Sequence, residues 1–246
     1  MATAGLEDPK VRMLEAAGRI FAERGFRDAT VRDICQAAQV NLAAVNYHFG
    51  DKERLYIESV KHAHRTRLQQ VPPPAWPSGT TAAVKLHGFI YAFLCRVLSD
   101  DRDGWEPQLM MRELAQPTLA CEELVREYIR PHFALLLQIL DELVPPATTQ
   151  AERNRIGFGI VGQCLHYRIA EPIVRLLITP EEFQQNDPAA LADHICRWTL
   201  AALGFDSAPT DPAALGNRPA RDNTPPTLKP RKRKSAAKIA KRKVRP

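Results

Sequence analysis

The sequence predicts an all-α protein, with a helix-turn-helix domain near the N-terminus and a larger helical domain behind it. Apolar residues recur at three- and four-residue intervals along most of the chain, and the alternation typical of strands is scarce. Hydrophobic residues make up 45% of the 246 residues, which is enough to fill a core. No run of about 18 apolar residues occurs, so we expect no membrane span.

The first helices are marked by capping and stop residues. An apolar face begins at Pro9, and Gly25 is expected to end that helix. Thr30, Asn41 and Asp51 each precede a periodic segment and are suited to be its N-cap. The helix after Asp51 is predicted to reach about residue 70.

Longer helices are predicted beyond a proline-rich loop at residues 71–79, which cannot be helical. Because Pro131 and Pro172 lie inside two of them, we expect a kink or break at each. The expected helices cover about residues 81–99, 108–114, 119–144, 152–178 and 188–203.

The charge of the chain is distributed unevenly. The net charge is +6, but residues 217–246 hold 12 of the 34 Lys and Arg residues and one of the 28 acidic residues. The remaining 22 basic and 27 acidic residues give the rest of the chain a net charge of −5. The segment 206–246 has no apolar periodicity, so we expect a disordered Pro-rich linker and basic tail.

The cysteines and the N-terminal residues indicate a reducing compartment. The five cysteines are widely spaced and include no CxxC pair, which fits neither a zinc site nor a disulfide scaffold. Residues 1–12 lack the apolar stretch of a signal peptide. We therefore expect a cytoplasmic protein that binds no metal and no cofactor.

The most informative window is Thr30–Lys52, which is predicted to form a helix, a tight turn and a second short helix. Its apolar residues are expected to pack inward, which leaves a lightly polar face on the second helix. A short helix of this kind fits the major groove of DNA. The residues predicted to contact DNA are Thr30, Asn41, Leu42, Ala43, Asn46, Tyr47, His48 and Lys52.

These residues are assigned different roles in the predicted interface. The Asn46 amide is suited to a bidentate contact with adenine, and Leu42 and Ala43 to a thymine methyl group. Thr30, Tyr47, His48 and Lys52 lie at helix ends or edges, where phosphates pass. The alternative for Asn46 is that it stays solvated, while backbone contacts and DNA shape provide specificity.

The window resembles the DNA-binding domain of the TetR/AcrR family of bacterial regulators. The pattern that carries the resemblance is Phe21-x-x-x-Gly25-Phe26, then Thr30, Tyr47-His48-Phe49 and Lys52-Glu53. Two residues depart from the family pattern, because Asn41 and Ala43 stand where the family usually has Ser and Gly. The segments 41–49 and 160–167 further resemble a subgroup that includes regulators of drug-efflux genes.

The resemblance implies an all-helical homodimer that represses genes from a palindromic operator on double-stranded DNA. It implies a DNA-binding domain at residues 9–60 and a ligand-binding and dimerisation domain at residues 80–205. A small-molecule effector would enter the second domain and change the spacing of the two DNA-reading heads. The helices at 152–178 and 188–203 would then form the four-helix bundle between subunits.

The effector contacts are predicted from polar and aromatic residues of the second domain. The candidates are His87, Tyr91, Met110, His132, His166 and Tyr167, with Trp105, Met111, Arg112 and Phe133 as further possibilities. The alternative is that a helical core simply contains them. Arg112, Glu113 and Arg168 are expected to form an ion-pair set. Because no catalytic constellation occurs, we expect no enzyme.

Two rival functions remain open. One is an architectural nucleic-acid protein that depends on the basic tail, and the other is a small-molecule-binding protein whose helix-turn-helix no longer binds DNA. The tail itself is expected to contact phosphates in a salt-dependent manner, with a merely solvated arm as the alternative.

Overall fold

The computed structural model describes residues 8–98 and 104–205, which form helices joined by short loops and turns and contain no strand. The all-α prediction is therefore confirmed for these residues. The predicted linker and tail at 206–246 lie outside them. No helix in the described ranges is both long and apolar enough to cross a bilayer.

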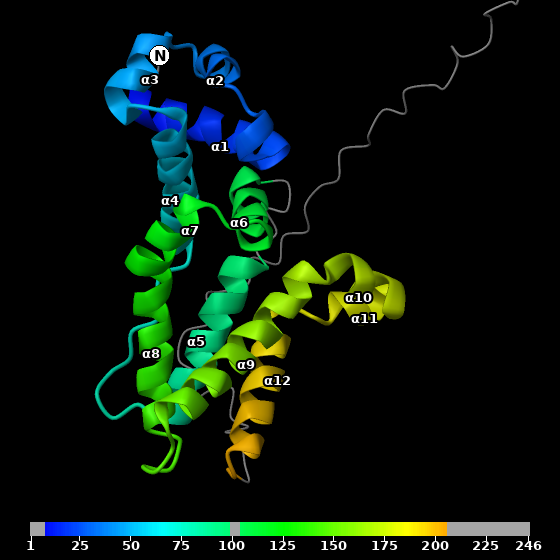
Figure 1. The fold of residues 1–246 in the computed structure, drawn as a ribbon. Helices are drawn as coiled ribbons and strands as arrows, with labels where there is room; N and C mark the ends of the chain where they lie inside the picture. Colours follow the sequence, from blue (N-terminus) through cyan, green and yellow to red (C-terminus); the bar gives the residue numbers. More distant parts are fainter. Residues whose placement is uncertain (1–7, 99–103, 206–246) are drawn as a thin grey trace, which may run out of the picture.

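The N-terminal half contains α1 to α7 and a π-helical segment (Figure 1). Their bounds are α1 Pro9–Asp28, α2 Val31–Ala38, α3 Leu42–Phe49, α4 Lys52–Gln70, α5 Ala82–Val97, α6 Trp105–Ala115, α7 Leu119–Leu124 and the π segment Val125–Ile129. The remaining helices are α8 Arg130–Asp141, α9 Gln150–Ile169, α10 Glu171–Leu177, α11 Pro180–Gln184 and α12 Pro188–Ala202.

Helices α1–α4, which we call the head, begin at the predicted caps. The side chains of Thr30, Asn41 and Asp51 accept hydrogen bonds from the backbone N–H of the third residue beyond each. Gly25 has φ +81° and interrupts the regular helix of α1, as expected for a residue without a Cβ. The predicted starts of α2, α3 and α4 are thus confirmed.

The core of the head includes residues from outside it. Trp105 and Leu109 of α6, together with Ala120 and Leu124 of α7, are buried in the same cluster as Phe21 and the other apolar residues of α1–α4. We call this set the head cluster. The division of the chain near residues 60–80 therefore does not coincide with a boundary between hydrophobic cores.

The contact between α1 and α6 depends on the absence of a side chain at Gly18. The six-membered ring of Trp105 occupies the space where a Cβ of Gly18 would lie. The Trp105 indole N–H donates to the Glu15 carboxylate at 3.1 Å, and the ring stacks with His62 of α4. Trp105 thus holds α1, α4 and α6 together.

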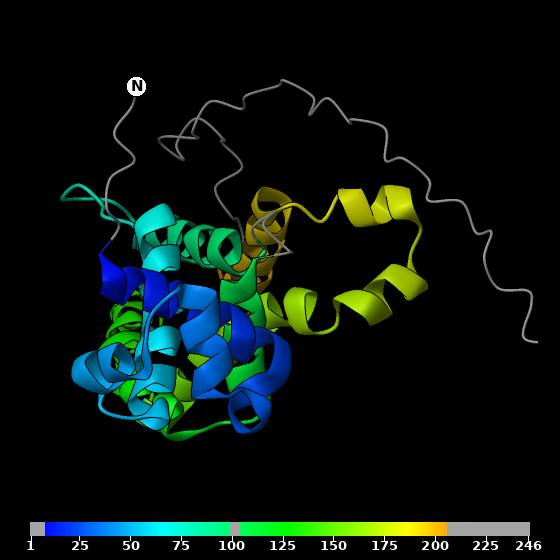
Figure 2. The ribbon, with the colours of Figure 1, turned by 90° about the horizontal axis from the view of Figure 1, so that it is seen from above.

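Helices α5, α8, α9 and α12 enclose a second core, the C-terminal cluster. Its fully buried residues are largely leucine and isoleucine, including Leu86, Ile90, Leu136 and Ile195. A capping box between Thr149 and Glu152 starts α9. Helices α10 and α11 extend sideways from this body, as the view from above shows (Figure 2).

The predicted break is confirmed at Pro172, whereas the helix around Pro131 is unbroken and changes to a π segment instead. The π segment directly precedes α8, which has Pro131 at its second position. The wider turn gives an alternative to the regular hydrogen bonding that proline disrupts. Helix α9 ends before Ala170, and α10 begins again with Pro172 in its first turn.

Other expectations need correction. Arg112, Glu113 and Arg168 do not form an ion-pair set. Arg112 donates to the backbone oxygens of Ala22 and Glu23, at 3.2 and 3.1 Å.

Glu113 is buried and accepts from the Tyr56 hydroxyl at 2.6 Å and the Thr118 N–H at 2.7 Å. Arg168 pairs with Glu171 instead. In addition, α6 starts earlier than predicted, α8 ends at Asp141, and α11 was not predicted.

A pair of histidines lies in the interior between α4 and α8. The rings of His64 and His132 are 6.3 Å apart, and the Nε2 atoms of both are buried without a hydrogen bond to any described residue. Burial, followed by the charges of His132 and Arg96, lowers the pKa of His64 from 6.5 to about 4. His64 is therefore a neutral imidazole in the folded protein near neutral pH.

Replacing Gly18 with alanine should destabilise the protein, although alanine is the better helix former. We expect a loss of about 1–3 kcal/mol, because the added methyl group overlaps Trp105. Urea unfolding followed by circular dichroism measures it. The double variant Gly18→Ala/Trp105→Leu should recover part of the loss, and an unchanged midpoint for Gly18→Ala would contradict the packing described.

Acidification should weaken the fold through His64. As the pH falls from 6.5 towards 4, the unfolded chain takes up a proton that the folded His64 does not. The free energy of unfolding should fall across this window by up to about 3 kcal/mol from this group. The His64→Phe variant should show a shallower pH dependence in urea unfolding between pH 7 and 4.5. Equal slopes would refute the assignment.

Candidate nucleic-acid interface

Helix α3 lies at the same end of the molecule as α1 and α2 (Figure 1), and it has one buried and one exposed side. Val45 and Phe49 are buried in the head cluster. The Asn41 side chain accepts from the Ala44 N–H at 2.9 Å, and Gln39, with φ +55°, makes the turn that separates α3 from α2. The helix therefore presents a fixed outer face.

The outer face carries the residues that the sequence predicted. Leu42, Ala43, Asn46, Tyr47 and His48 are all exposed, and Tyr47 is 86% exposed. Asn46 is exposed, and no hydrogen bond within the described chain engages its amide. The structure brings these five residues together on one short helix.

The helices before and after α3 also have capped N-termini. The Thr30 hydroxyl accepts from the Asp33 N–H at 3.1 Å, and the Asp51 carboxylate accepts from the Arg54 N–H at 2.7 Å. The remaining free N–H groups of the first turns of α2 and α4 are suited to anions. Both ends were predicted to lie along a phosphate backbone.

Lys52 is less free than the sequence suggested. Its ammonium donates to the Arg27 carbonyl at 3.2 Å and lies 4.7 Å from the centre of the Phe26 ring. It thereby joins the start of α4 to the end of α1. The ammonium has three N–H groups, so donors remain for a phosphate.

Sequence reasoning missed Lys10, at the start of α1. Its ammonium lies 5.9 Å from the centre of the Phe49 ring, beside the end of α3. A basic side chain next to α3 is placed where it could meet a phosphate. The sequence gives no signal that Lys10 lies near α3, because the two are brought together only by the packing of α1 beside α3.

The six predicted effector contacts are dispersed. His87 of α5 pairs with Asp193 of α12 at 2.7 Å, and His132 donates from Nδ1 to the Tyr128 carbonyl at 2.7 Å. Met110 packs against the head cluster, Tyr91 and Tyr167 pack against the C-terminal cluster, and His166 is exposed. None of the six lines either of two clefts in the described parts of the chain, one beside α10 and one beside the end of α1.

The described cysteines behave as small core residues or partly buried thiols. Burial raises the pKa of Cys164 and of Cys196 to about 12, so neither is a reactive thiolate. Across residues 8–98 and 104–205, no three His, Cys, Asp or Glu side chains are grouped as metal ligands.

Two family models match separate parts of the chain. Residues 13–58 match the model described as bacterial regulatory proteins of the tetR family. Residues 82–203 match the C-terminal domain of the HTH-type transcriptional dual regulator CecR. Together the two models cover most of the residues that the structure describes.

Two repressors match a short part of the chain. The HTH-type transcriptional repressor AcnR of Corynebacterium efficiens is 47% identical over 45 residues, 18% of this chain and 24% of that protein. KstR2, a repressor from Rhodococcus jostii, is 37% identical over 59 residues, 24% of this chain and 29% of that protein. The chain thus matches only about a quarter of the length of these two repressors.

A longer match joins the two parts. The dual regulator CecR of Shigella flexneri is 24% identical over 182 residues, which cover 69% of this chain and 80% of that protein. These matches do not test the predicted likeness to drug-efflux regulators.

Solved structures share the fold. A bacterial regulatory protein in the tetR family from Rhodococcus RHA1 superposes with a TM-score of 0.58 at 16% identity, covering 80% of this chain and 98% of that one. A TetR-like regulator from Rhodococcus sp. RHA1 gives 0.56 at 18% identity, with 79% and 95% covered. With a TetR-type head and a CecR-type C-terminal domain in one helical chain, the protein belongs to the TetR family of bacterial regulators.

Proposed function

We propose that this protein is a sequence-specific DNA-binding transcriptional regulator, which acts as a homodimer and represses its target genes in response to a small molecule. The observation that carries the proposal is the outward face of α3, with Asn46 unengaged and capped N-termini on the helices before and after it. It is not an enzyme under this proposal, and it would act on double-stranded DNA in the cytoplasm.

The proposed reading of DNA follows from the chemistry of α3. An amide side chain that makes two hydrogen bonds fits the N6 and N7 edge of adenine, and Leu42 and Ala43 fit a thymine methyl group. Tyr47, His48, Thr30, Asn41 and Lys52 lie around this reading face and are proposed to contact sugar and phosphate groups. Because residues 1–216 carry a net charge of −5, affinity would depend on these local contacts and on the basic tail.

The proposed dimer uses the exposed sides of α9 and α12. Phe158 of α9 and Trp198 of α12 are exposed, the latter by 65%. Gly159 and Gly162 have open space where a Cβ would lie, so a second helix can approach α9 closely. Two copies joined by a twofold axis would present two α3 helices to a palindromic site.

The link between effector and DNA is proposed to pass through α6 and α4. Helix α4 is part of the head and contacts α6, and α6 bonds directly to the C-terminal part of α1 through Arg112. An effector that prefers the arrangement with low DNA affinity would weaken DNA binding. DNA would weaken effector binding by the same factor.

Selection of bound sequences from random DNA tests the reading face. We expect the full chain, and a chain ending at Gly216, to enrich the same palindrome. Asn46→Ala should lose about 1–3 kcal/mol of binding to that site and relax one position of it. Gln138→Ala removes an exposed amide from α8 and serves as the matched control.

Other outcomes would favour the rival functions. Salt-sensitive binding without enrichment, lost in the chain ending at Gly216, would support an architectural protein that depends on its tail. Absence of DNA binding at low salt would support a small-molecule-binding protein. Either result would overturn the proposed regulator.

The dimer proposal predicts the molar mass in solution. Light scattering after size exclusion should give twice the 27.6 kDa of the chain. Trp198→Asp places a charge on the proposed interface and should shift the protein towards the monomer. Gln138→Ala should leave the mass unchanged. A wild-type monomer at high concentration would exclude the proposed dimer.

A further inference from the structure

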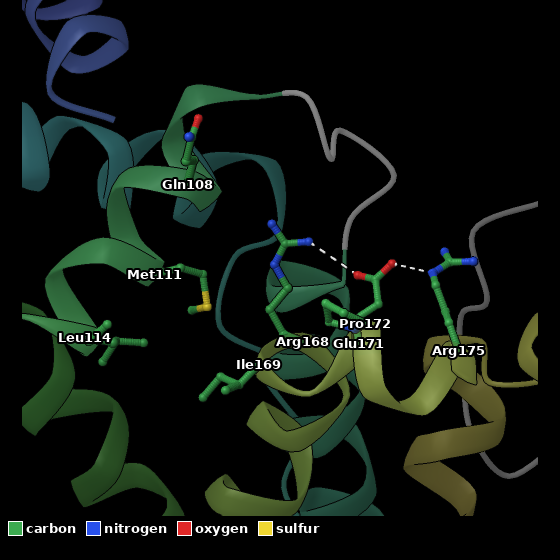
Figure 3. A pocket seen from close by; sticks show the side chains of 9 residues that line it. Gln108, Met111, Leu114, Arg168, Ile169, Glu171, Pro172 and Arg175 are labelled. Carbon is green, nitrogen blue, oxygen red and sulfur yellow. Dashed lines mark hydrogen bonds and ion pairs between the residues drawn. The ribbon is translucent and has the colours of Figure 1, made fainter. Parts of the chain in front are cut away.

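A cleft of about 880 Å³ lies between α6 and the junction of α9 and α10, outside the C-terminal cluster (Figure 3). One wall is a face of α6 that includes Met111 and Leu114. The other wall contains Arg168, Ile169 and Glu171. The volume is within the range of roughly 300–1,000 Å³ typical of small-molecule sites.

The polar side of this cleft has an excess of positive charge. Arg175 donates to the Glu171 carboxylate at 2.9 Å and stacks on Phe183. Arg168 reaches the same carboxylate only at 3.7 Å, which is beyond hydrogen-bond length. Two guanidinium groups thus share one carboxylate among the residues that line the cleft.

Arg168 is the unusual member of this pair. Its side chain is only 16% exposed, yet no hydrogen bond joins its guanidinium to any residue of the described chain. Figure 3 shows it extending from the end of α9, between Met111 and Glu171. A partly buried guanidinium that still has hydrogen-bond donors available is suited to a second carboxylate, which it can bind through two parallel bonds.

The rest of the cleft is apolar. Met111, Leu114, Ile169 and Pro172 line it, and Leu114, Ile169 and Pro172 are exposed in the free protein. A ligand that covered them would gain from the burial of apolar surface. A purely apolar ligand would leave the hydrogen-bond donors of Arg168 unused, and a cation would face two arginines.

We propose that this cleft binds an amphipathic carboxylate, with its head group on Arg168 and its apolar body along Met111, Leu114 and Ile169. The inference deepens the proposed function, because it names the chemical class of the effector and a location different from the six residues first predicted. The opposite side of α6 holds the head through Trp105 and Arg112. A ligand bound against α6 is therefore separated from α1 only by α6.

Isothermal titration of the full chain, with decanoate as the probe, tests the proposal. Decyltrimethylammonium has an alkyl chain of similar length with the opposite charge and should bind at least about tenfold more weakly. Arg168→Gln should weaken decanoate binding by about tenfold. Glu171→Gln removes the competing carboxylate and should strengthen it by about threefold.

Arg126→Gln is the control, because it removes an exposed arginine of the π segment and should change binding by less than about twofold. The opposite effects of Arg168→Gln and Glu171→Gln distinguish a binding site from a structural ion pair. Thermal unfolding by circular dichroism verifies that each variant is folded.

Three results would overturn the proposal. They are equal binding of both probes, decanoate binding unaffected by Arg168→Gln, and binding that appears only in the monomeric Trp198→Asp variant. The last would mean that a second copy of the chain covers the cleft. DNA selection needs no decanoate, so an enriched palindrome without decanoate binding would leave the regulator standing and reject only this ligand class.

Discussion

The contact between Trp105 of α6 and the bare helix surface at Gly18 of α1 determines how the two halves of this protein are joined. The indole fills the space of a missing side chain. Arg112, about two helical turns beyond Trp105, donates to the carbonyl groups of Ala22 and Glu23, just before the interruption of α1 at Gly25. Since Trp105 and Leu109 are part of the head cluster, the head does not have a core of its own. Helix α6 cannot shift without changing the packing of α1, and α1 supports α2 and α4.

The DNA-reading helix could be predicted from the sequence because its determinants are local. Thr30, Asn41 and Asp51 satisfy the first N–H groups of α2, α3 and α4 with their own side chains, so each helix start is fixed within four residues of sequence. The outward face of α3 then follows from helical periodicity, once Val45 and Phe49 are assigned to the interior. The break before Pro172 was predictable for the same reason, because proline acts on its own turn.

Features that depend on distant residues were not predictable in this way. Arg112, Glu113 and Arg168 carry complementary charges, but their true partners are Ala22 and Glu23 on α1, Tyr56 on α4, and Glu171. The cleft beside α6 is likewise formed by segments more than fifty residues apart in sequence, so no local pattern indicates it. By contrast, α11 was missed despite a visible signal. Thr179 and Glu182 form a capping box in front of a helix too short to show an apolar stripe.

The π segment between α7 and α8 has a consequence for how this chain tolerates insertions and deletions. Helix α7 buries Ala120 and Leu124 in the head cluster, whereas α8 buries Leu136 and Leu140 in the C-terminal cluster. The nearly continuous helix formed by α7, the π segment and α8 therefore contributes to two cores. The π segment determines the rotation between the buried face of α7 and that of α8. Gaining or losing one residue there would rotate α8 by about 100° relative to α7 and turn its leucines away from α5 and α9. A junction between two halves of a protein usually tolerates changes in length. Here the number of residues in the π segment is as constrained as the identity of the buried side chains.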